Sequence, residues 1–268
     1  MNWTDRYLKL LNVEHSLPTY DFLQELMEAH LHVVPFEIVS KYHYFSSREP
    51  HDLIPTKEEF LDNAIQRGWG GNCYILNIHF GELLRTLGFD TNYVRAVGGN
   101  AHLASMVTID ANRYYVDVGY MAPLFEPVQL EKEPHLARCG EEIIINRRSD
   151  HEYIIDRRTG GQSFVMKTIE WFPVERETFV DDIIHAHRDE DENPFMRRII
   201  ATRFNNRVCY QVINSKLLIK SDTDIQAKEY TNKEEWLDMM QSHFSFDERD
   251  LAFALDFLAK RKVELFSN

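Results

Sequence analysis

The chain has 268 residues, which is enough to bury a large core, and its 44% hydrophobic and 27% charged residues are typical of a folded protein. Its formal net charge of −13 argues against nucleic acid or an anionic membrane surface as the main partner. The N-terminal segment lacks the apolar core of a signal peptide, and no apolar run approaches the roughly 18 residues of a membrane-spanning helix. We therefore expect a cytoplasmic protein.

The first 88 residues place apolar side chains at helical spacing, which predicts a helical unit. Helices are expected over residues 3–12, 19–31 and 57–67. The second and third are opened by Pro18-Thr19 and Pro55-Thr56, which are favourable N-terminal signals. Pro35 ends the second helix, and an apolar segment follows it. Its aromatic residues could line a pocket, but core packing is the stronger expectation for Tyr42, Tyr44 and Phe45.

The stretch 66–88 carries the most informative residue of the chain, Cys73. Gly70 and Gly71 lead to Asn72, a good N-cap residue, and apolar residues then recur at helical spacing until Gly88. Cys73 is thus expected in the first turn of a helix, where free backbone N–H groups and the helix dipole favour a thiolate. The alternative is a small buried hydrophobe, the commoner role of an isolated cysteine.

After Gly88 the pattern changes to alternating Val, Ile, Tyr and Thr, which predicts strands. We expect strands over residues 91–97, 103–109, 113–118, 142–146, 153–157, 163–172 and 207–219. Asp110-Ala111-Asn112 is expected to form a turn between the second and the third. The acidic segment Glu175–Asn193 is expected to be helical and to end before Pro194.

Residues 233–265 predict two helices, with Ser245-Phe246-Asp247 as the cap between them. No internal repeat or low-complexity linker separates the parts, so the units should pack together. We expect an α+β protein in three parts. They are a helical domain over residues 1–88 that carries the nucleophile, a β domain over 89–193, and an α/β lid over 194–268.

A cysteine nucleophile needs a base, and the base needs a group that orients it. His102 begins a predicted strand, and Asp117 lies in an apolar strand where a carboxylate must find a partner. A tight turn centred on Ala111 and Asn112 would place both on one face but four positions out of register, about 13 Å apart. A bulge, strong twist or wider turn would have to close that distance. Otherwise His102 is an exposed loop residue and Asp117 caps a turn.

Short motifs of this chain resemble those of arylamine N-acetyltransferases and follow the same order. They are Pro35-Phe36-Glu37, Gly70-Gly71-Asn72-Cys73 with Asn77, Ala101-His102-Leu103, Asp117-Val118-Gly119 and Asn193-Pro194-Phe195. The resemblance covers about residues 35 to 210. It implies an N-terminal helical bundle, a central β-barrel-like unit and a C-terminal α/β lid around a catalytic core like that of cysteine proteases.

The resemblance also implies a catalytic triad of Cys73, His102 and Asp117 and a ping-pong acyl transfer. Cys73 would take the acetyl group of acetyl-CoA, and an arylamine or arylhydrazine would then attack the acetyl-cysteine. Gly119, near the thioester, would leave room for the pantetheine arm of acetyl-CoA. The implied partners are these small molecules alone, with no bound cofactor, no metal, no nucleic acid and no membrane. We expect a monomer or a weak homo-oligomer.

Three positions depart from the family's pattern. Trp69 stands where the family usually has Arg, with Arg67 two positions earlier, Ile38 replaces Asn, and Tyr120-Met121 replaces Phe-Gly. Three alternatives remain open, and the departures make the last of them plausible. The alternatives are an amide synthase that uses another acyl donor, a transglutaminase- or papain-like hydrolase, and a paralogue that binds a ligand without turnover.

Other polar residues suggest weaker sites. His185 and His187 point apart on a helix, so a solvated helical face is expected in place of a metal site. Cys139 and Cys209 are expected to be inert thiols, and no disulfide framework or metal motif follows from three widely spaced cysteines. Seven arginines could meet CoA phosphates, but surface charge is the stronger expectation for all of them. They are Arg147, Arg148, Arg157, Arg158, Arg197, Arg198 and Arg203. Phosphate binding has slightly more support for the last three.

Overall fold

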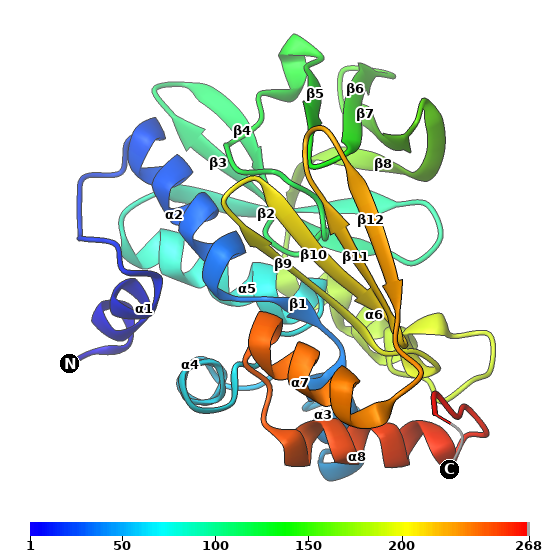
Figure 1. Cartoon of the computed structure of the whole chain (residues 1–268). Coiled ribbons are helices and arrows are strands. Elements are labelled where there is room, and N and C mark those ends of the chain that lie inside the picture. Colours follow the sequence, from blue (N-terminus) through cyan, green and yellow to red (C-terminus); the bar gives the residue numbers. More distant parts are fainter. Residues whose placement is uncertain (267–268) are drawn as a thin grey trace.

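Helices come first in the chain, strands dominate its middle and two helices end it, as Figure 1 shows for the computed structural model, which describes residues 1–266. This order confirms the predicted α+β class. Four predicted helices are present within two residues of their expected ends: α1 (Trp3–Leu11), α2 (Tyr20–Val33), α4 (Lys57–Arg67) and α5 (Cys73–Thr86). Thr19 and Thr56 cap α2 and α4, because each side chain accepts a hydrogen bond from a backbone N–H in the first turn.

The apolar segment after Pro35 forms a short strand, β1 (Phe36–Glu37), and a helix, α3 (Val39–Ser47). Tyr42 and Tyr44 are buried in the core, as expected, and the ring of Tyr42 stacks at 4.2 Å on Phe257 of the C-terminal region. This contact fixes α3 against the end of the chain.

Seven antiparallel strands form the larger sheet, which curls into part of a barrel. In spatial order they are β4 (Asn112–Val116), β3 (His102–Ile109), β2 (Asp90–Val97), β8 (Gln162–Val174), β7 (Glu152–Thr159), β6 (Glu141–Arg147) and β5 (His135–Arg138). The alternating sequence predicted six of them, and β5 was missed. One cluster of buried apolar side chains fills the inner face of this sheet.

A second, five-stranded sheet corrects the prediction of one strand over 207–219. It runs β1, β9 (Ile200–Asn205), β10 (Val208–Ile213), β11 (Lys216–Lys220) and β12 (Ile225–Glu229). The predicted strand is a hairpin that turns at Asn214, whose φ of 57° is tolerated by asparagine. The alternation continues on both sides of the turn and hides it. β12 was missed because all five of its residues are exposed and carry no core pattern.

The acidic segment Glu175–Asn193 is less helical than expected. A 3₁₀ turn (Arg176–Phe179) leads into a short helix, α6 (Val180–Ala186), and residues 187–193 are irregular. The side chain of Asn193 folds back and donates to the carbonyls of Ala186 and Arg188, which closes the helix end. His187 is buried, contrary to the expected solvated face, and its Nδ1 lies 2.7 Å from the carbonyl of Ile183.

The chain ends in the two predicted helices, α7 (Lys233–Phe244) and α8 (Glu248–Ala259). Ser245 takes a left-handed φ of 64° and Asp247 caps α8, as the sequence suggested. The largest apolar core joins these helices to the N-terminal helices and the five-stranded sheet. The domain boundaries at residues 88 and 193 stay a prediction. Strand pairing joins the first and last of the predicted parts, because β1 pairs with β9 and Phe36 stands opposite Thr202.

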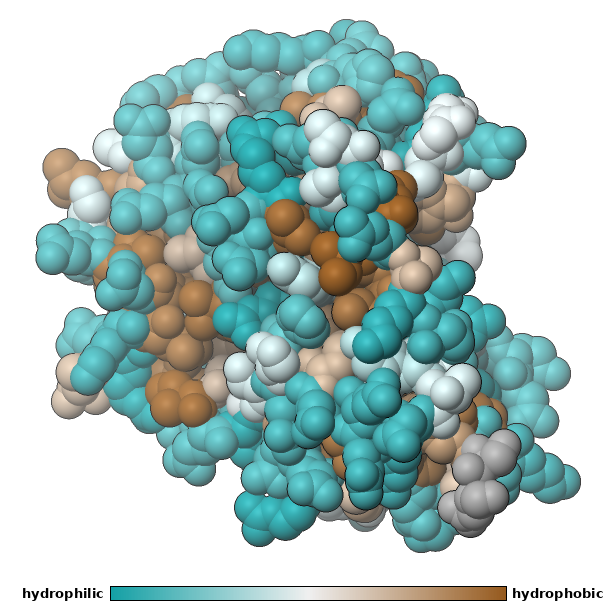
Figure 2. All heavy atoms as spheres, viewed as in Figure 1, coloured by the Kyte–Doolittle hydropathy of each residue, from teal (hydrophilic) through white to brown (hydrophobic). Residues whose placement is uncertain are grey.

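The outer surface seen in Figure 2 is mostly hydrophilic, with apolar side chains in small groups. In the part of the chain that is described, none of the helices combines the length and the apolar character needed to cross a membrane.

Candidate active site

Cys73 is the first residue of α5 and is half-buried. The side chain of Asn72 caps the helix, because its Oδ1 accepts from the N–H groups of Tyr74 and Ile75 at 3.1 Å each. The preceding loop lies against β1, where the N–H of Glu37 donates to the carbonyl of Gly71 at 3.0 Å. A Cβ on Gly70 would lie 1.8 Å from the carbonyl oxygen of Pro35, so only glycine fits there. The glycines thus bring the loop close enough to β1 to fix the start of α5.

His102 and Asp117 lie closer together than the predicted register allowed. The hairpin turns at Asp110 and Ala111, whose φ values are 48° and 63°, and Ile109 stands opposite Asn112. This two-residue turn, which matches the strand twist, begins one position earlier than expected. It reduces the offset between His102 and Asp117 from four positions to two, and the two side chains become diagonal neighbours. The His102 Nε2 to Asp117 Oδ2 distance is 2.6 Å.

The carboxylate of Asp117 is buried and fully hydrogen-bonded. Its Oδ2 accepts from the hydroxyl of Tyr115 at 2.7 Å, and its Oδ1 accepts from Asn77 Nδ2 at 2.8 Å and from the N–H of Gly119 at 2.9 Å. Burial alone would raise the pKa of Asp117, but the charge and hydrogen bond of His102 outweigh it, with help from Tyr115 and Asn77. The pKa is lowered, and the carboxylate is ionised at neutral pH.

The imidazole of His102 is buried between this carboxylate and Cys73. Burial alone would lower its pKa, but the negative charges and hydrogen bonds of Asp117 and Cys73 raise it to about 9. Since Nε2 faces Asp117, Nδ1 is the ring nitrogen left for Cys73. His102 can therefore carry a proton between Asp117 and the sulfur of Cys73 at neutral pH.

Asn77, one turn after Cys73 on α5, joins the helix to both strands of the pair. Its Nδ2 also donates to the carbonyl of Leu103 at 2.7 Å, and its Oδ1 accepts from the N–H of Val118 at 3.0 Å. Sequence reasoning noted Asn77 as part of a motif but gave it no role. Its three hydrogen bonds fix the distance from the sulfur-bearing helix to the segments that carry His102 and Asp117.

Gly119 is packed against the nucleophile's backbone. A Cβ at Gly119 would lie 2.7 Å from Cys73 Cα and 2.8 Å from Asn77 Nδ2, so this position must be glycine for the helix to approach. Gly119 also lines the cavity described next, and its expected role beside a pantetheine arm stays a prediction.

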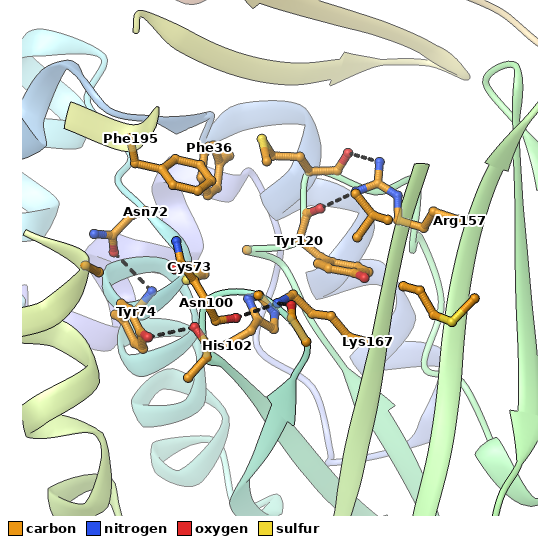
Figure 3. Close-up of a pocket in the computed structure, with 18 of the residues that line it drawn as sticks. Phe36, Asn72, Cys73, Tyr74, Asn100, His102, Tyr120, Arg157, Lys167 and Phe195 are labelled. Atoms are coloured by element: carbon orange, nitrogen blue, oxygen red, sulfur yellow. Dashed lines mark hydrogen bonds between the residues drawn. The ribbon is translucent and has the colours of Figure 1, made fainter. Parts of the chain in front are cut away.

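A cavity of about 420 Å³ opens above Cys73, a volume suited to a small ligand. Cys73, His102 and Gly119 line it, whereas Asp117 lies behind His102. Figure 3 shows Phe36 and Phe195 on one side of Cys73, and Tyr120, Arg157 and Lys167 on the other. The remaining lining residues are Lys41, Asn72, Tyr74, Gly98, Gly99, Asn100, Ala101, Met121, Phe164, Val165, Met166 and Ala186.

Arg157 is buried, which corrects its expected place on the surface. Its guanidinium pairs with Glu141 at 2.6 Å and donates to the carbonyls of Tyr120 and Met121 at 2.7 and 2.9 Å. It thereby holds the loop after Gly119 in place. Two adjacent arginines, Arg157 and Arg158, are typical of surface charge, and nothing in the immediate sequence reveals the buried partner of Arg157.

The other arginines considered for phosphate binding have partners within the protein or lie at the surface. Arg197 pairs with Asp189 and Asp191, and Arg203 donates to backbone carbonyls of His32 and His243. Arg147, Arg148, Arg158 and Arg198 are half-exposed or exposed.

Cys139 and Cys209 are both buried, and neither lines the cavity. Burial raises the pKa of each thiol to about 12. They remain protonated at neutral pH, in keeping with the expected inert thiols.

Trp69, where the family usually has Arg, is buried between α3 and α8. Its Nε1 donates to Asp250 Oδ2 at 2.9 Å, and the guanidinium of Arg67 lies 3.7 Å from the Trp69 ring centroid while also pairing with Asp250. Glu37 of the Pro-Phe-Glu motif is buried without a cation; burial raises its pKa to about 7, although hydrogen bonds from Ser40 oppose the rise. Trp69, Arg67 and Asp250 therefore support the loop that leads to Cys73.

Two lysines that sequence reasoning missed line the cavity beside Cys73. Lys41 of α3 is 1% exposed, and Lys167 of β8 is half-buried. The available signal was weak: Lys41 stands in an apolar run, four residues after Glu37, where a lysine is unexpected.

Comparison with known proteins gives a match to a family model described as N-acetyltransferase, over residues 19–249. Among solved structures, the arylamine N-acetyltransferase of Salmonella typhimurium is 17% identical, with a TM-score of 0.81 and coverage of 97% of this chain and 99% of that chain. The Mycobacterium marinum enzyme, solved in complex with CoA, is 18% identical, with a TM-score of 0.79 and the same coverage. At these identities the structures show a common fold.

A curated relative is proansamycin X synthase of Amycolatopsis mediterranei (strain S699), 28% identical over 117 residues. The match covers 40% of this chain and 44% of that protein, so the chain matches less than half the length of this relative.

Proposed function

Because the chain belongs to the N-acetyltransferase family, we propose that it transfers the acetyl group of acetyl-CoA to an arylamine or arylhydrazine through an acetyl-cysteine at Cys73. The observation that carries the proposal is the cavity above Cys73, with His102 beside the sulfur and Asp117 hydrogen-bonded behind His102 at 2.6 Å. A nucleophile, a base and an orienting carboxylate are the groups that acyl transfer needs.

In the first half-reaction, the Cys73 thiolate attacks the carbonyl carbon of the acetyl thioester. The bond between that carbon and the CoA sulfur then breaks, and the proton on His102 passes to the CoA sulfur, which leaves as a thiol. The backbone N–H of Cys73 lies at the start of α5, where it can stabilise the oxyanion of the tetrahedral intermediate.

In the second half-reaction, the neutral amine attacks the carbonyl carbon of acetyl-Cys73. His102, now unprotonated, accepts a proton from the attacking nitrogen, and the carbon–sulfur bond breaks to restore the thiolate. Asp117 stays ionised throughout and stabilises the imidazolium of His102. Asn77 and Tyr115 act on Asp117 and not on the substrate, so we treat them as positioning residues.

Use of CoA as the leaving group is supported by the shared fold with the Mycobacterium marinum enzyme, whose structure was solved in complex with CoA. Apolar side chains dominate the cavity, as an aromatic acceptor requires.

A second candidate is an amide synthase that uses the same residues with an acyl group other than acetyl. The 117-residue match to proansamycin X synthase favours it. The two candidates share the acyl-cysteine and differ in the acyl donor.

A steady-state assay tests the proposal. Release of CoA and formation of N-acetyl product are measured while the concentrations of acetyl-CoA and an arylamine are varied. A ping-pong reaction gives parallel double-reciprocal lines, and the variants Cys73→Ser and His102→Gln should abolish turnover. Intersecting lines with undiminished activity of Cys73→Ser would contradict an acyl-enzyme. Turnover only with longer acyl-CoA donors would favour the amide synthase.

A further inference from the structure

The cavity above Cys73 is cationic in an otherwise acidic protein. The chain has a formal net charge of −13, yet three side chains with basic groups line the cavity besides the catalytic His102: Lys41, Arg157 and Lys167. None of the described residues that line it is Asp or Glu. The sign of the cavity is thus opposite to the sign of the whole molecule, which points to an anionic ligand group.

Arg157 does not supply the free charge. Glu141 faces it at 2.6 Å and also accepts from Lys220 at 2.8 Å, and the remaining donors of Arg157 serve the carbonyls of Tyr120 and Met121. Its planar face packs on the rings of Tyr120 and Phe164. Arg157 therefore builds the cavity wall.

Lys41 has no carboxylate partner. Its Nζ donates to the backbone carbonyls of Ala186 at 2.7 Å and Phe195 at 3.2 Å. An ammonium group has three N–H donors, so one remains when these two bonds are made. Because the side chain is buried and lines the cavity, the third donor can be satisfied only from within the cavity or not at all.

Lys167 of β8 repeats the arrangement. Its Nζ donates to the carbonyls of Gly98 at 2.8 Å and Asn100 at 2.6 Å, and again no carboxylate is bonded to it. Burial lowers the pKa of Lys41 and of Lys167, and in both cases the charge of Cys73 opposes the shift. Both ammonium groups are thus within electrostatic range of the sulfur.

Charging two amino groups that are held only by neutral carbonyls in an apolar cavity is costly unless an anion joins them. The Cys73 thiolate already has His102 as its counterion, and it loses its charge once it is acylated. The phosphates of CoA do not fit this role, since the pantetheine arm holds them far from the thioester. The anion must belong to the part of a substrate that lies beside the reacting carbonyl.

We propose that the cavity binds a substrate carboxylate carried on an apolar or aromatic body, and that Lys41 and Lys167 receive this carboxylate. The inference rests on the proposed function, because it specifies the substrate class of the same site. The rings of Phe36, Phe164 and Phe195 provide the apolar surface that such a body requires. The carboxylate can belong to the acceptor amine or to the acyl group of the donor, and different substrates distinguish the two sources.

The test uses pairs of substrates with nearly the same shape and different charge. For the acceptor, para-aminobenzoate is compared with para-aminobenzamide at saturating acetyl-CoA. For the acyl group, malonyl-CoA is compared with acetoacetyl-CoA in acylation of Cys73. The readout is the ratio of kcat/KM, or of acylation rate, within each pair, for the wild type, Lys41→Met, Lys167→Met and Lys41→Arg. Lys216→Met, on the exposed face of β11, is the matched control.

One pair should favour the carboxylate about tenfold to a hundredfold in the wild type, the range expected for a charge-assisted hydrogen bond. Lys41→Met and Lys167→Met should each reduce that ratio about tenfold. Lys41→Arg, which keeps a positive charge, should retain part of the wild-type ratio, and Lys216→Met should leave it unchanged. A preference in the acceptor pair assigns the carboxylate to the amine, and one in the donor pair assigns it to the acyl group. Ratios near one in both pairs, or ratios unaffected by the lysine variants, would overturn the proposal.

Binding to Cys73→Ala separates this inference from the proposed function. Calorimetric titration of that variant with both pairs of compounds measures the carboxylate preference without turnover. If the wild type is not acylated but the variant still prefers the carboxylate, the proposed reaction fails and the subsite stands. If acetyl transfer proceeds but no pair shows a preference in binding or in rate, the subsite fails and the reaction stands.

Discussion

The indole of Trp69 donates a hydrogen bond of 2.9 Å to Asp250, and this contact ties the loop before Cys73 to α8. Asp250 is buried and also pairs with Arg67, whose guanidinium stacks on the Trp69 ring. A loop that begins the nucleophile's helix is thereby supported by a helix some 180 residues later in the chain. Asp250 is thus the buried hydrogen-bond acceptor that a tryptophan requires at this position, where the family usually has arginine.

Replacing Asp250 by Ala should destabilise the protein and slow acylation. The change leaves the buried Trp69 N–H without an acceptor and Arg67 without its carboxylate, which costs about 2 kcal/mol of the free energy of unfolding. Urea denaturation measures the loss, and Asp256→Ala is the control, since Asp256 on the same helix makes only an exposed pair with Lys260. Equal losses in the two variants would contradict a supporting role for Asp250.

Gly119→Ala should impair acylation of Cys73 because the new Cβ would lie 2.7 Å from Cys73 Cα. Backbone must shift to relieve that contact, so we expect a loss of about 1–3 kcal/mol in stability and at least about a hundredfold in acylation rate. Gly161→Ala is the control. It places a residue at a φ of +78° with nothing within 4 Å of its Cβ, so it tests backbone strain without a clash. A Gly119→Ala protein that is acylated at the wild-type rate would refute the packing argument.

The rate of Cys73 acylation should fall as the pH rises through about 9. The pKa of His102 is raised to about 9 against the effect of burial by Asp117 and Cys73, so below that pH His102 is protonated and above it the proton is lost. Without it, the departing CoA sulfur receives no proton and the thiolate loses its counterion. Single-turnover rates between pH 6 and 10 provide the measurement. A rate that rises through pH 9, as for an unassisted thiol, would exclude the ion pair.

Stability should decline in mild acid because three histidines are buried as neutral groups. Burial lowers the pKa of His30, His79 and His187 to about 3. Their contribution is therefore fully present above the unfolded-state pKa of about 6.5 and is lost as pH falls toward 3, about 2 kcal/mol for each residue by pH 5. Glu37 acts in the opposite direction, because its pKa is raised to about 7.

Urea denaturation at pH 7.5 and 5.5 tests this pH dependence. His79 stacks on Phe60 and neither ring nitrogen has a hydrogen-bond partner within the described protein. His79→Leu should therefore keep the packing and reduce the stability difference between the two pH values. An equal stability difference between the two pH values in the variant and the wild type would show that His79 does not contribute to the pH dependence.

Much of the site was predictable because its signals are local. Asn72 caps α5 through its own side chain, and the glycines before Cys73 act on their immediate neighbours, so sequence spacing was sufficient. The hairpin between β3 and β4 was also predictable, but its register depended on whether Asp110 or Asn112 occupied the turn. Both residue types tolerate a left-handed φ, so the pattern left the choice open.

The missed features depend on partners that are distant in the chain. Lys41 is buried because carbonyls of Ala186 and Phe195 accept from its Nζ, and Arg157 is buried because Glu141 and the carbonyl of Tyr120 meet it. No periodicity in the surrounding residues reports such contacts. These side chains, and not the motif residues, give this cavity its own chemistry.

The most direct test of the proposed function is the intact mass of the protein after brief exposure to acetyl-CoA, without an amine. The account predicts the addition of one acetyl group, located on Cys73 by peptide mapping, removed by an arylamine and absent in Cys73→Ser. Cys209→Ser, which removes a buried thiol, should still be acetylated. An unmodified wild-type protein, or an acetyl group on another residue that persists in Cys73→Ser, would contradict the account.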